Sequence, residues 1–383
     1  MNSTVTSSIA AEIDALPKAL RAELDRFGFD PLLLQKWSAS LQGPETVTER
    51  RVHRNRVAGS VSPPTEAEVT SLPPVGSDAY KALERRGAES IARGELAFVV
   101  MAGGMATRMG GVVKALVEVF PKRTFLDLRL AENRMAQQKW GTIPLFLMTS
   151  AATDAPIRDA LSAATPGDHV RTFPQFSSLR LTNEGKLFRD EAGHPSSYAT
   201  GHGDLVDALL RAKLLEAFKP KYVWITNLDN LGATVDPAML GAFIERESPV
   251  LVEVCDKAPG DRGGIPARAE GRLQILEEFR LPPDFDPQTV TVFNTNSFLI
   301  RADKLLSSPF PWTYFEVEKK VSGMPAIQFE RLLQEVTAHW DTKCLRVSRT
   351  GAESRFLPVK DHPELAARLP VIEEVLRARG IPV

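Results

Sequence analysis

Short apolar segments alternate with amphipathic ones along most of the chain after residue 95. The apolar runs include LAFVVM (96–101), IPLFLMTS (143–150) and YVWIT (222–226), and each ends in or is followed by polar or small residues. Between them, apolar positions recur every three or four residues, as in GDLVDALLRAKLLEAF (203–218). Strands that alternate with helices in this way predict an α/β layer fold with a largely parallel sheet.

The pattern changes between residues 250 and 300, where strand-like segments follow one another closely. They read PVLVEVCD (249–256), IPARAEGRLQIL (265–276) and VTVFNTNSFLI (290–300), and Glu270-Gly271 is a two-residue hairpin signal. We therefore expect an antiparallel insertion in the otherwise parallel architecture.

The first part of the chain is charged and has helical periodicity up to about residue 58. Two Pro-Pro pairs between residues 59 and 78 indicate an extended connector, and a further helix precedes the first strand. The basic segment ERRVHRNR (49–56) is interpreted as a solvated helix face. The predicted domains are a helical N-terminal extension with its connector over residues 1–88 and an α/β domain over residues 89–383.

Composition narrows the class of protein. The 383 residues are 43% hydrophobic and 25% charged, with a formal net charge of −1, so no general basic field favours nucleic acid or a membrane surface. The two cysteines lack metal or disulfide spacing, no secretory signal opens the chain, and no apolar run approaches the ~20 residues of a membrane span. We expect a cytoplasmic protein.

Candidate chemistry lies where the predicted strands end, because ligands of open α/β sheets bind beyond the carboxyl ends of the strands. The first loop, AGGMATRMGGVVK (102–114), has glycines that allow close approach to a phosphate, followed by Arg108 and Lys114. It matches neither GxGxxG nor GxxxxGK[ST]. On its residues alone, it is either a phosphate-binding loop or a tight strand–helix turn.

Two further positions have the same ambiguity. Asp229 follows a predicted strand, where a carboxylate can hold Mg²⁺ against phosphates or can instead close an Asx-turn. His202, in the run GHGD (201–204), is flanked by glycines at the start of a predicted helix, which suggests a backbone that approaches something closely. No Ser-His-Asp order, HExxH motif or Cys/His cluster is present, so the chemistry is one of charge and positioning.

Taken together, these segments resemble the UDP-sugar pyrophosphorylase family, and within it the UTP–glucose-1-phosphate uridylyltransferases. The resemblance covers roughly residues 85–362 in six ordered blocks, of which ITNLDNLGATVDPAML is the most specific. The others are AGGMATRMGGVVKALVEVFPKRTFLDL, GHGDLVDAL, GGIPARAEGRLQILEEFRLP, FNTNSFLI and RFLPVK.

The resemblance implies a Rossmann-like, GT-A-like nucleotidyltransferase with a mixed sheet. It implies Mg²⁺ as cofactor, UTP and a sugar-1-phosphate as substrates, and UDP-sugar and pyrophosphate as products. Glucose-1-phosphate is the expected sugar; N-acetylglucosamine-1-phosphate or a broad range is the alternative.

Site residues follow from the same resemblance, position by position. The catalytic cations would be Arg108, Lys114 and Lys360. The nucleotide would contact Ala102, Gly103, Gly104, Gln175, Gly201 and His202. The sugar would contact Asn227, Gly264, Glu277 and Asn294, and Asp229 would hold the metal.

The chain departs from the family pattern at three places. Val113 replaces a proline before the loop lysine, Ser297 replaces the second asparagine of a pair, and Ala199-Thr200 replaces Pro-Pro before GHGD. We expect no C-terminal β-helix domain, and the oligomeric state is left open.

Two interpretations from other classes stay open. A dinucleotide-binding oxidoreductase would require GxGxxG and an acidic residue ~20 positions later, which are not found in that arrangement. A non-catalytic protein that retains the fold would bind UTP without turnover.

Overall fold

The computed structural model describes residues 8–261, 263–307 and 309–383. Contacts within the chain divide it into two compact units, each made of three separate segments. The first comprises Met1–Arg56, Pro174–Ala208 and Pro311–Leu333, and the second comprises Val57–Phe173, Leu209–Phe310 and Gln334–Val383. Residues 57–88 therefore belong to the second unit.

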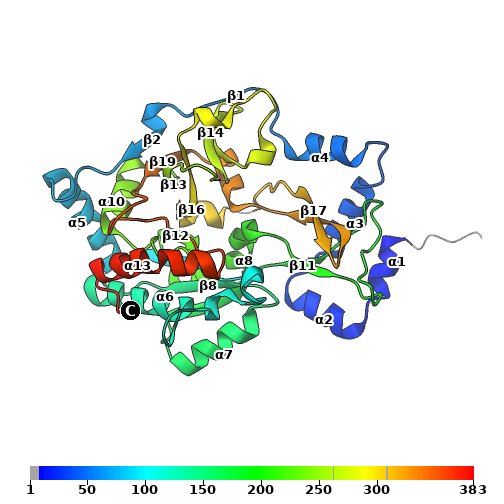
Figure 1. Cartoon of the computed structure of the whole chain (residues 1–383), viewed down its shortest axis with the longest axis horizontal. Coiled ribbons are helices and arrows are strands. Elements are labelled where there is room, and N and C mark those ends of the chain that lie inside the picture. The colour runs from blue at the N-terminus through cyan, green and yellow to red at the C-terminus, as the bar shows by residue number, and fades with distance from the viewer. Residues whose placement is uncertain (1–7, 262, 308) are drawn as a thin grey trace, which may run out of the picture. The chain divides into compact units, whose positions relative to one another are not determined.

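An eight-stranded mixed sheet organises the second unit, in the order β2-β19-β13-β16-β12-β3-β8-β9 (Figure 1). β16 runs antiparallel to both of its neighbours, whereas β3, β8 and β12 are mutually parallel. This confirms the predicted mixed α/β fold. The strands span Val69–Ser71 (β2), Thr342–Arg346 (β19), Val250–Asp256 (β13), Val292–Arg301 (β16), Tyr222–Asn227 (β12), Leu96–Met101 (β3), Leu145–Thr149 (β8) and Val170–Pro174 (β9).

The central strands are apolar and buried on both faces of the sheet. Every residue of β3 and β8 is buried, as expected of parallel strands with two covered faces.

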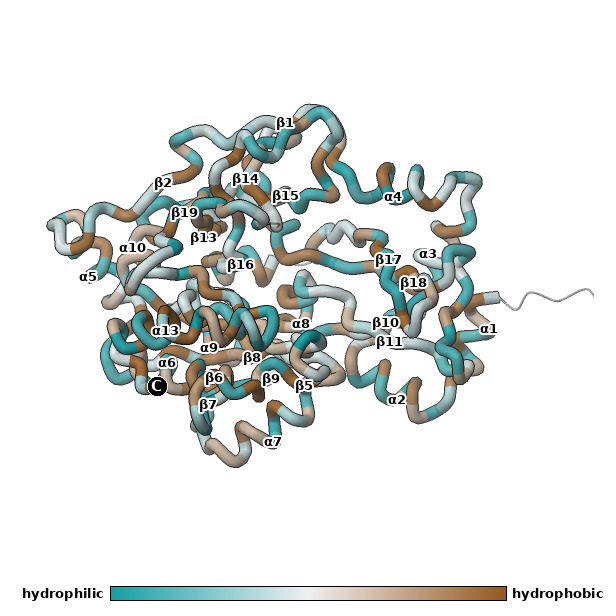
Figure 2. The backbone as a smooth tube through the Cα atoms, viewed as in Figure 1, coloured by the Kyte–Doolittle hydropathy of each residue, from teal (hydrophilic) through white to brown (hydrophobic). Residues whose placement is uncertain are grey.

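α6 begins with a capping box between Thr124 and Asp127. Hydrophobic and hydrophilic stretches alternate along α13 in Figure 2. The main helices are α5 (Asp78–Ala92), α6 (Phe125–Trp140), α7 (Asp154–Ala164), α8 (Leu205–Arg211), α9 (Leu214–Phe218), α10 (Pro237–Arg246) and α13 (His362–Ala378).

The hairpin predicted at Glu270-Gly271 is confirmed. β14 (Ile265–Ala269) and β15 (Arg272–Leu276) pair through a two-residue turn in which both residues have positive φ, and β1 (Val61–Ser62) adds a third strand. The expected insertion is smaller than predicted, however. The segments around 250 and 300 form β13 and β16 of the main sheet, where nearly all of their residues are buried.

Short elements complete the second unit. They are β4 (Met105–Ala106), β5 (Val112–Val113), β6 (Glu118–Phe120), β7 (Arg123–Thr124), α11 (Ala302–Leu306) and α12 (Val336–His339). Within the residues described, no helix is both long enough and apolar enough to cross a membrane.

The first unit packs helices on two antiparallel strand pairs. Its helices are α1 (Ile9–Asp14), α2 (Lys18–Arg26), α3 (Pro31–Ser40) and α4 (Val47–Asn55), and its pairs are β10 (Ser177–Leu179) with β11 (Ser197–Ala199) and β17 (Phe315–Val321) with β18 (Met324–Glu330). Trp37 stacks on Phe329 with ring centroids 4.9 Å apart, and both belong to the apolar core of this unit.

The basic segment of α4 is not the solvated face that its sequence suggested. Arg50, Arg51 and Arg54 converge on Glu316, whose side chain is fully buried. A buried carboxylate requires such partners, so these arginines bind an internal group.

Candidate functional site

Three parallel strands end side by side at one edge of the sheet. The Ala102 N–H donates to the Met148 carbonyl at 2.8 Å, and the Leu228 N–H donates to the Met101 carbonyl at 3.3 Å. The Ser150 hydroxyl donates to the Gly103 carbonyl at 2.9 Å. The glycine loop, the end of β8 and the loop after β12 are therefore in direct contact, as predicted for a site at the carboxyl ends of the strands.

The glycine loop folds as a small hairpin rather than a direct strand–helix turn. After Ala102–Gly104, β4 pairs with β5, and a 3₁₀ turn begins at Lys114. The Lys114 N–H donates to the Gly104 carbonyl at 3.2 Å, which closes the loop. Arg108 is exposed in this hairpin, and no ion pair of its side chain is found among the described residues.

Lys114 and Asp229 form an ion pair between the glycine loop and the loop after β12. Their side chains are 19% and 15% exposed. The cation predicted to bind phosphate and the carboxylate predicted to bind metal thus lie next to each other, although they are 115 positions apart in sequence. The Asp229 carboxylate faces the lysine, whereas the Asx-turn alternative would direct it at its own backbone.

The replacement of proline by Val113 leaves the loop backbone in a conformation that proline also adopts. Val113 has φ −64° and ψ 118°, and proline fixes φ near about −65°. The φ of position 113 is therefore compatible with proline, and the replacement does not require a different backbone φ before Lys114.

A buried arginine holds the loop that carries Asp229. Arg129 on α6 has no exposed surface, and its guanidinium pairs with Glu132 at 2.6 Å. A planar fork of five donors suits such a cluster of acceptors. The guanidinium donates to the carbonyl groups of Asn227, Leu228, Asn230 and Ala233. Sequence reasoning missed this residue; its signal was an arginine among apolar residues with a glutamate three positions later.

The predicted sugar contacts are joined by hydrogen bonds through a residue that was not predicted. Asn296 donates from its side chain to Asn227 Oδ1 at 3.0 Å and from its backbone to Asn294 Oδ1 at 2.8 Å. It adopts φ 61°, a left-handed conformation that asparagine tolerates better than most residues. Ser297, by contrast, is fully buried and bonds to Thr226 at 2.9 Å, so it faces the core.

Gly264 and Glu277, the other two predicted sugar contacts, lie next to Asn294 and to each other. The Asn294 N–H donates to the Gly264 carbonyl at 2.8 Å. A Cβ on Gly264 would lie 2.8 Å from the Ile275 side chain and 3.1 Å from Glu277 Oε1, so only glycine fits there. Burial raises the pKa of Glu277, against the opposing effect of the Gly264 N–H.

Among the described residues, no hydrogen bond or ion pair joins Lys360 to Lys114 or Asp229. Lys360 is exposed next to the N-cap of α13, and its N–H donates to Glu364 at 2.7 Å. Burial tends to raise the pKa of Asp261, but hydrogen bonds from Arg349 and the charge of Lys360 bring it below its usual value.

The remaining nucleotide residues, Gln175, Gly201 and His202, belong to the first unit. Asp204 connects their segments: it accepts hydrogen bonds from the Phe176 N–H at 3.0 Å and from the Thr200 hydroxyl at 2.7 Å. Its other oxygen accepts from Arg331 at 2.7 Å. The Asp204 carboxylate of GHGD therefore has a structural role, because it joins three segments of the first unit by hydrogen bonds.

Gly201, the first residue of GHGD, is required by a close contact within the first unit. Gly201 has φ 102°, and a Cβ there would lie 2.3 Å from the Arg331 carbonyl oxygen. The close approach expected from the sequence is thus made by a backbone of the same unit. His202 is partly buried, its Nδ1 accepts from the Leu333 N–H at 3.1 Å, and burial lowers its pKa to about 4. It is a neutral imidazole with its proton on Nε2.

The donor set suits a metal that is shared with a ligand. No cluster of three His, Cys, Asp or Glu side chains with metal-binding geometry occurs in the part of the chain that the structure describes. Mg²⁺ commonly binds one or two carboxylates together with substrate phosphates, and the single carboxylate of Asp229 fits that mode.

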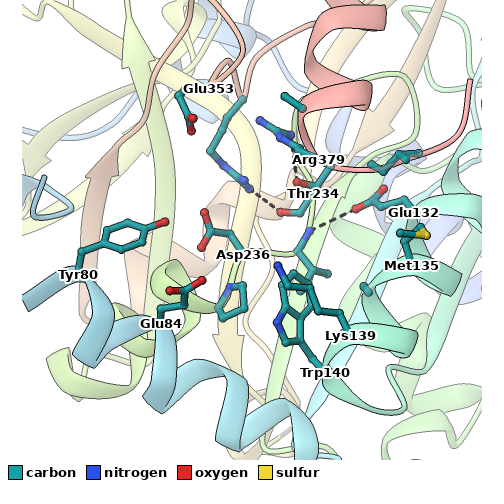
Figure 3. Close-up of a pocket in the computed structure, with 16 residues that line it drawn as sticks. Tyr80, Glu84, Glu132, Met135, Lys139, Trp140, Thr234, Asp236, Glu353 and Arg379 are labelled. Atoms are coloured by element: carbon teal, nitrogen blue, oxygen red, sulfur yellow. Dashed lines mark hydrogen bonds between the residues drawn. The ribbon is translucent and has the colours of Figure 1, made fainter. Parts of the chain in front are cut away.

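A cavity of about 280 Å³ opens elsewhere in the second unit, between α5, α6, α10 and the end of α13 (Figure 3). None of the predicted site residues lines it. Its wall carries carboxylates, including Glu84 and Asp236, as well as the cations Lys139 and Arg379, so its charge selects no ligand class.

Comparison with known proteins gives a consistent result. Residues 49–369 match the family model described as UTP–glucose-1-phosphate uridylyltransferase. A protein of that name from Musa acuminata is 31% identical over 295 residues, which cover 71% of this chain and 62% of the relative. The corresponding Saccharomyces cerevisiae protein is 30% identical, with 71% and 58% covered. The chain thus spans about 60% of the length of these relatives.

Solved structures share the fold. A uridine diphosphate N-acetylglucosamine pyrophosphorylase from Trypanosoma brucei aligns with a TM-score of 0.74 at 22% identity, covering 94% of this chain and 81% of that one. A variant of UDP-glucose pyrophosphorylase from Leishmania major aligns with a TM-score of 0.71 at 23% identity, covering 92% and 79%.

Proposed function

Because this chain belongs to the UTP–glucose-1-phosphate uridylyltransferase family, we propose that it transfers the uridylyl group of UTP to a sugar-1-phosphate and releases pyrophosphate. The observation that carries the proposal is the contact between Lys114 and Asp229 at the carboxyl edge of the sheet. A cation for phosphates and a carboxylate for a metal are the two groups that this chemistry requires in one place.

The reaction needs no general base. An oxygen of the sugar-1-phosphate, already ionised, attacks the α-phosphorus of UTP, and the bond from that phosphorus to the bridging oxygen breaks as pyrophosphate leaves. The obstacle is the repulsion between two polyanions and the charge that develops on pyrophosphate. Lys114 and Arg108 would offset that charge, Lys360 would contribute from the segment before α13, and alignment of the reactants can supply ~7–11 kcal/mol.

Mg²⁺ would be held by Asp229 together with phosphate oxygens of UTP, and when bound it neutralises phosphate charge. Lys114 would then exchange its carboxylate partner for a phosphate oxygen. Cys255 and Cys344 are both free and buried, which supports the proposed cytoplasmic location.

Glucose-1-phosphate is the proposed sugar. Support comes from the connected polar groups Asn227, Asn296 and Asn294, followed by Gly264 and Glu277. Amide and carboxylate groups held by one another are suited to the hydroxyl groups of a hexose.

Pyrophosphate release from UTP, measured with a panel of sugar-1-phosphates in the presence of Mg²⁺, tests the function. We expect turnover with glucose-1-phosphate to exceed that with N-acetylglucosamine-1-phosphate. Faster turnover of the acetamido sugar would correct the substrate, and the absence of turnover with every sugar would refute the function.

A further inference from the structure

Gln334 contacts a residue of the proposed sugar site but belongs to none of the blocks that identified it. Its side chain is 2% exposed, and its amide nitrogen donates a hydrogen bond of 2.6 Å to Oε1 of Glu277. Glu277 itself is only partly buried, so a ligand can reach it.

The backbone of Gln334 is fixed to the hairpin strand that precedes Glu277. The Thr337 hydroxyl donates to the Gln334 carbonyl at 2.6 Å, and Oγ1 of Thr337 accepts from the Ile275 N–H at 2.9 Å. The neighbouring Glu335 pairs with Arg280, three residues after Glu277. The segment that carries Gln334 is therefore bound to residues on both sides of Glu277 in the sequence, Ile275 before it and Arg280 after it.

The orientation of the amide is set by the carboxylate. Within the described residues, Gln334 Oε1 is buried and accepts no hydrogen bond. Reversing the amide would direct this oxygen at the Glu277 carboxylate, acceptor against acceptor. Since a buried acceptor without a donor lowers stability, the bond to Glu277 is what the glutamine contributes.

We propose that Gln334 is a positioning residue that sets sugar specificity by holding the Glu277 carboxylate as the acceptor for one hydroxyl group of the sugar-1-phosphate. The proposal rests on the proposed function. Gly264 also lies close to this carboxylate, because a Cβ added at Gly264 would lie only 3.1 Å from Glu277 Oε1. A fixed carboxylate discriminates against a sugar that lacks the hydroxyl, since the hydrogen bond between that hydroxyl and the carboxylate would be missing in the complex.

The test compares glucose-1-phosphate with its monodeoxy analogues at saturating UTP and Mg²⁺. The quantity measured is the ratio of kcat/KM for glucose-1-phosphate to kcat/KM for each analogue. We expect Gln334→Met, which preserves side-chain length, to lower the largest of these ratios on the order of tenfold. The KM for UTP and the melting temperature should stay near their wild-type values.

Gln274→Leu is the matched control. Gln274 is 1% exposed on β15, and its amide donates to the Ala269 carbonyl at 3.0 Å, so this variant also removes a buried amide but leaves Glu277 untouched. Its ratios should match those of the wild type. In a Glu277→Gln background, Gln334→Met should change the ratios little, because both residues act through one carboxylate.

Wild-type ratios in Gln334→Met would overturn the proposal, as would a loss of activity that is equal for every sugar. Additive effects of Gln334→Met and Glu277→Gln would also contradict it, because they would show independent action. Failure of the wild type to turn over any sugar-1-phosphate would be visible before any variant is made and would refute the proposed function as well.

Discussion

At the scale of single residues, Lys114 and Asp229 neutralise each other in the absence of ligand. Both side chains are mostly buried, and an unpaired charge in that position would be costly. A triphosphate with Mg²⁺ offers each residue a new partner of opposite charge, so the proposed site keeps its charges compensated with and without ligand.

Replacing Lys114 by alanine should lower kcat by a factor of about 100 or more, because a cation proposed to stabilise the leaving pyrophosphate is lost. The fold should stay intact, but the melting temperature should fall, because the mostly buried Asp229 carboxylate loses its counter-ion. Steady-state pyrophosphate release and thermal unfolding measure the two effects. Lys186→Ala, at an exposed lysine, is the control, and wild-type kcat in Lys114→Ala would contradict the assignment.

His202 should make stability depend on pH in one direction. Its pKa is about 4 in the folded protein because of burial, against about 6.5 in an unfolded chain. Between these values the unfolded state binds more protons, so the contribution of His202 is fully present above about pH 6.5 and is lost as the pH falls toward 4.

The free energy of unfolding of the wild type should therefore fall relative to that of His202→Gln as the pH is lowered from 7 to 4. We expect a difference on the order of 1–3 kcal/mol, measured by urea titration at several pH values. The comparison isolates His202 from other groups that titrate in the same range. Parallel pH profiles for the two proteins would show that His202 titrates normally in the folded state.

At the scale of elements, the loop after β12 is held by hydrogen bonds from two other parts of the chain, α6 and residues 355–357. Arg129 on α6 donates to its carbonyl groups. Asn230 donates to the Arg355 carbonyl at 3.1 Å and accepts from the Leu357 N–H at 2.8 Å. Asp229 is thus presented between two anchored neighbours.

Replacing Arg129 by leucine should lower the free energy of unfolding by about 3–5 kcal/mol, because the buried Glu132 would lose its counter-ion. It should also raise the Mg²⁺ concentration needed for half-maximal activity, since Asp229 would no longer be held in place. Chemical denaturation and a metal titration report these effects. Arg129→Lys retains the charge without the fork and should be intermediate in both; an unchanged metal titration in Arg129→Leu would limit the role of Arg129 to stability.

The elements that the sequence predicted are those whose signals are local. Each of these signals, the apolar runs of β3, β8 and β12 and the Glu270-Gly271 turn, is contained within a few consecutive residues, so periodicity and turn chemistry suffice. The contacts of Arg129 with residues 227–233, and of Gln334 with Glu277, join distant segments. Gly201 shows the same limit: the sequence indicated a close approach, and only the structure identified Arg331 as what approaches.

At the scale of the whole molecule, each compact unit is assembled from three stretches of the chain. Composition and linkers mark boundaries along the sequence, and they cannot show that residues 174–208 and 311–333 join residues 1–56 in one unit. Likewise, the expected roles of the site residues follow from the resemblance of the sequence to the UDP-sugar pyrophosphorylase family, whereas the contacts between these residues are visible only in the structure.

Binding of UTP with Mg²⁺ should raise the stability of the folded chain by mass action. At a UTP concentration of 100 times Kd, the gain is about 2.7 kcal/mol, which should appear as a melting temperature several degrees higher in the presence of Mg²⁺ than with a chelator. Asp229→Asn should remove the part of the shift that requires Mg²⁺, because the carboxylate proposed to hold the metal is lost. Asp303→Asn, at an exposed aspartate on α11, should retain it. A full metal-dependent shift in Asp229→Asn would place the metal elsewhere, and a shift with NADH in place of UTP would favour the oxidoreductase interpretation.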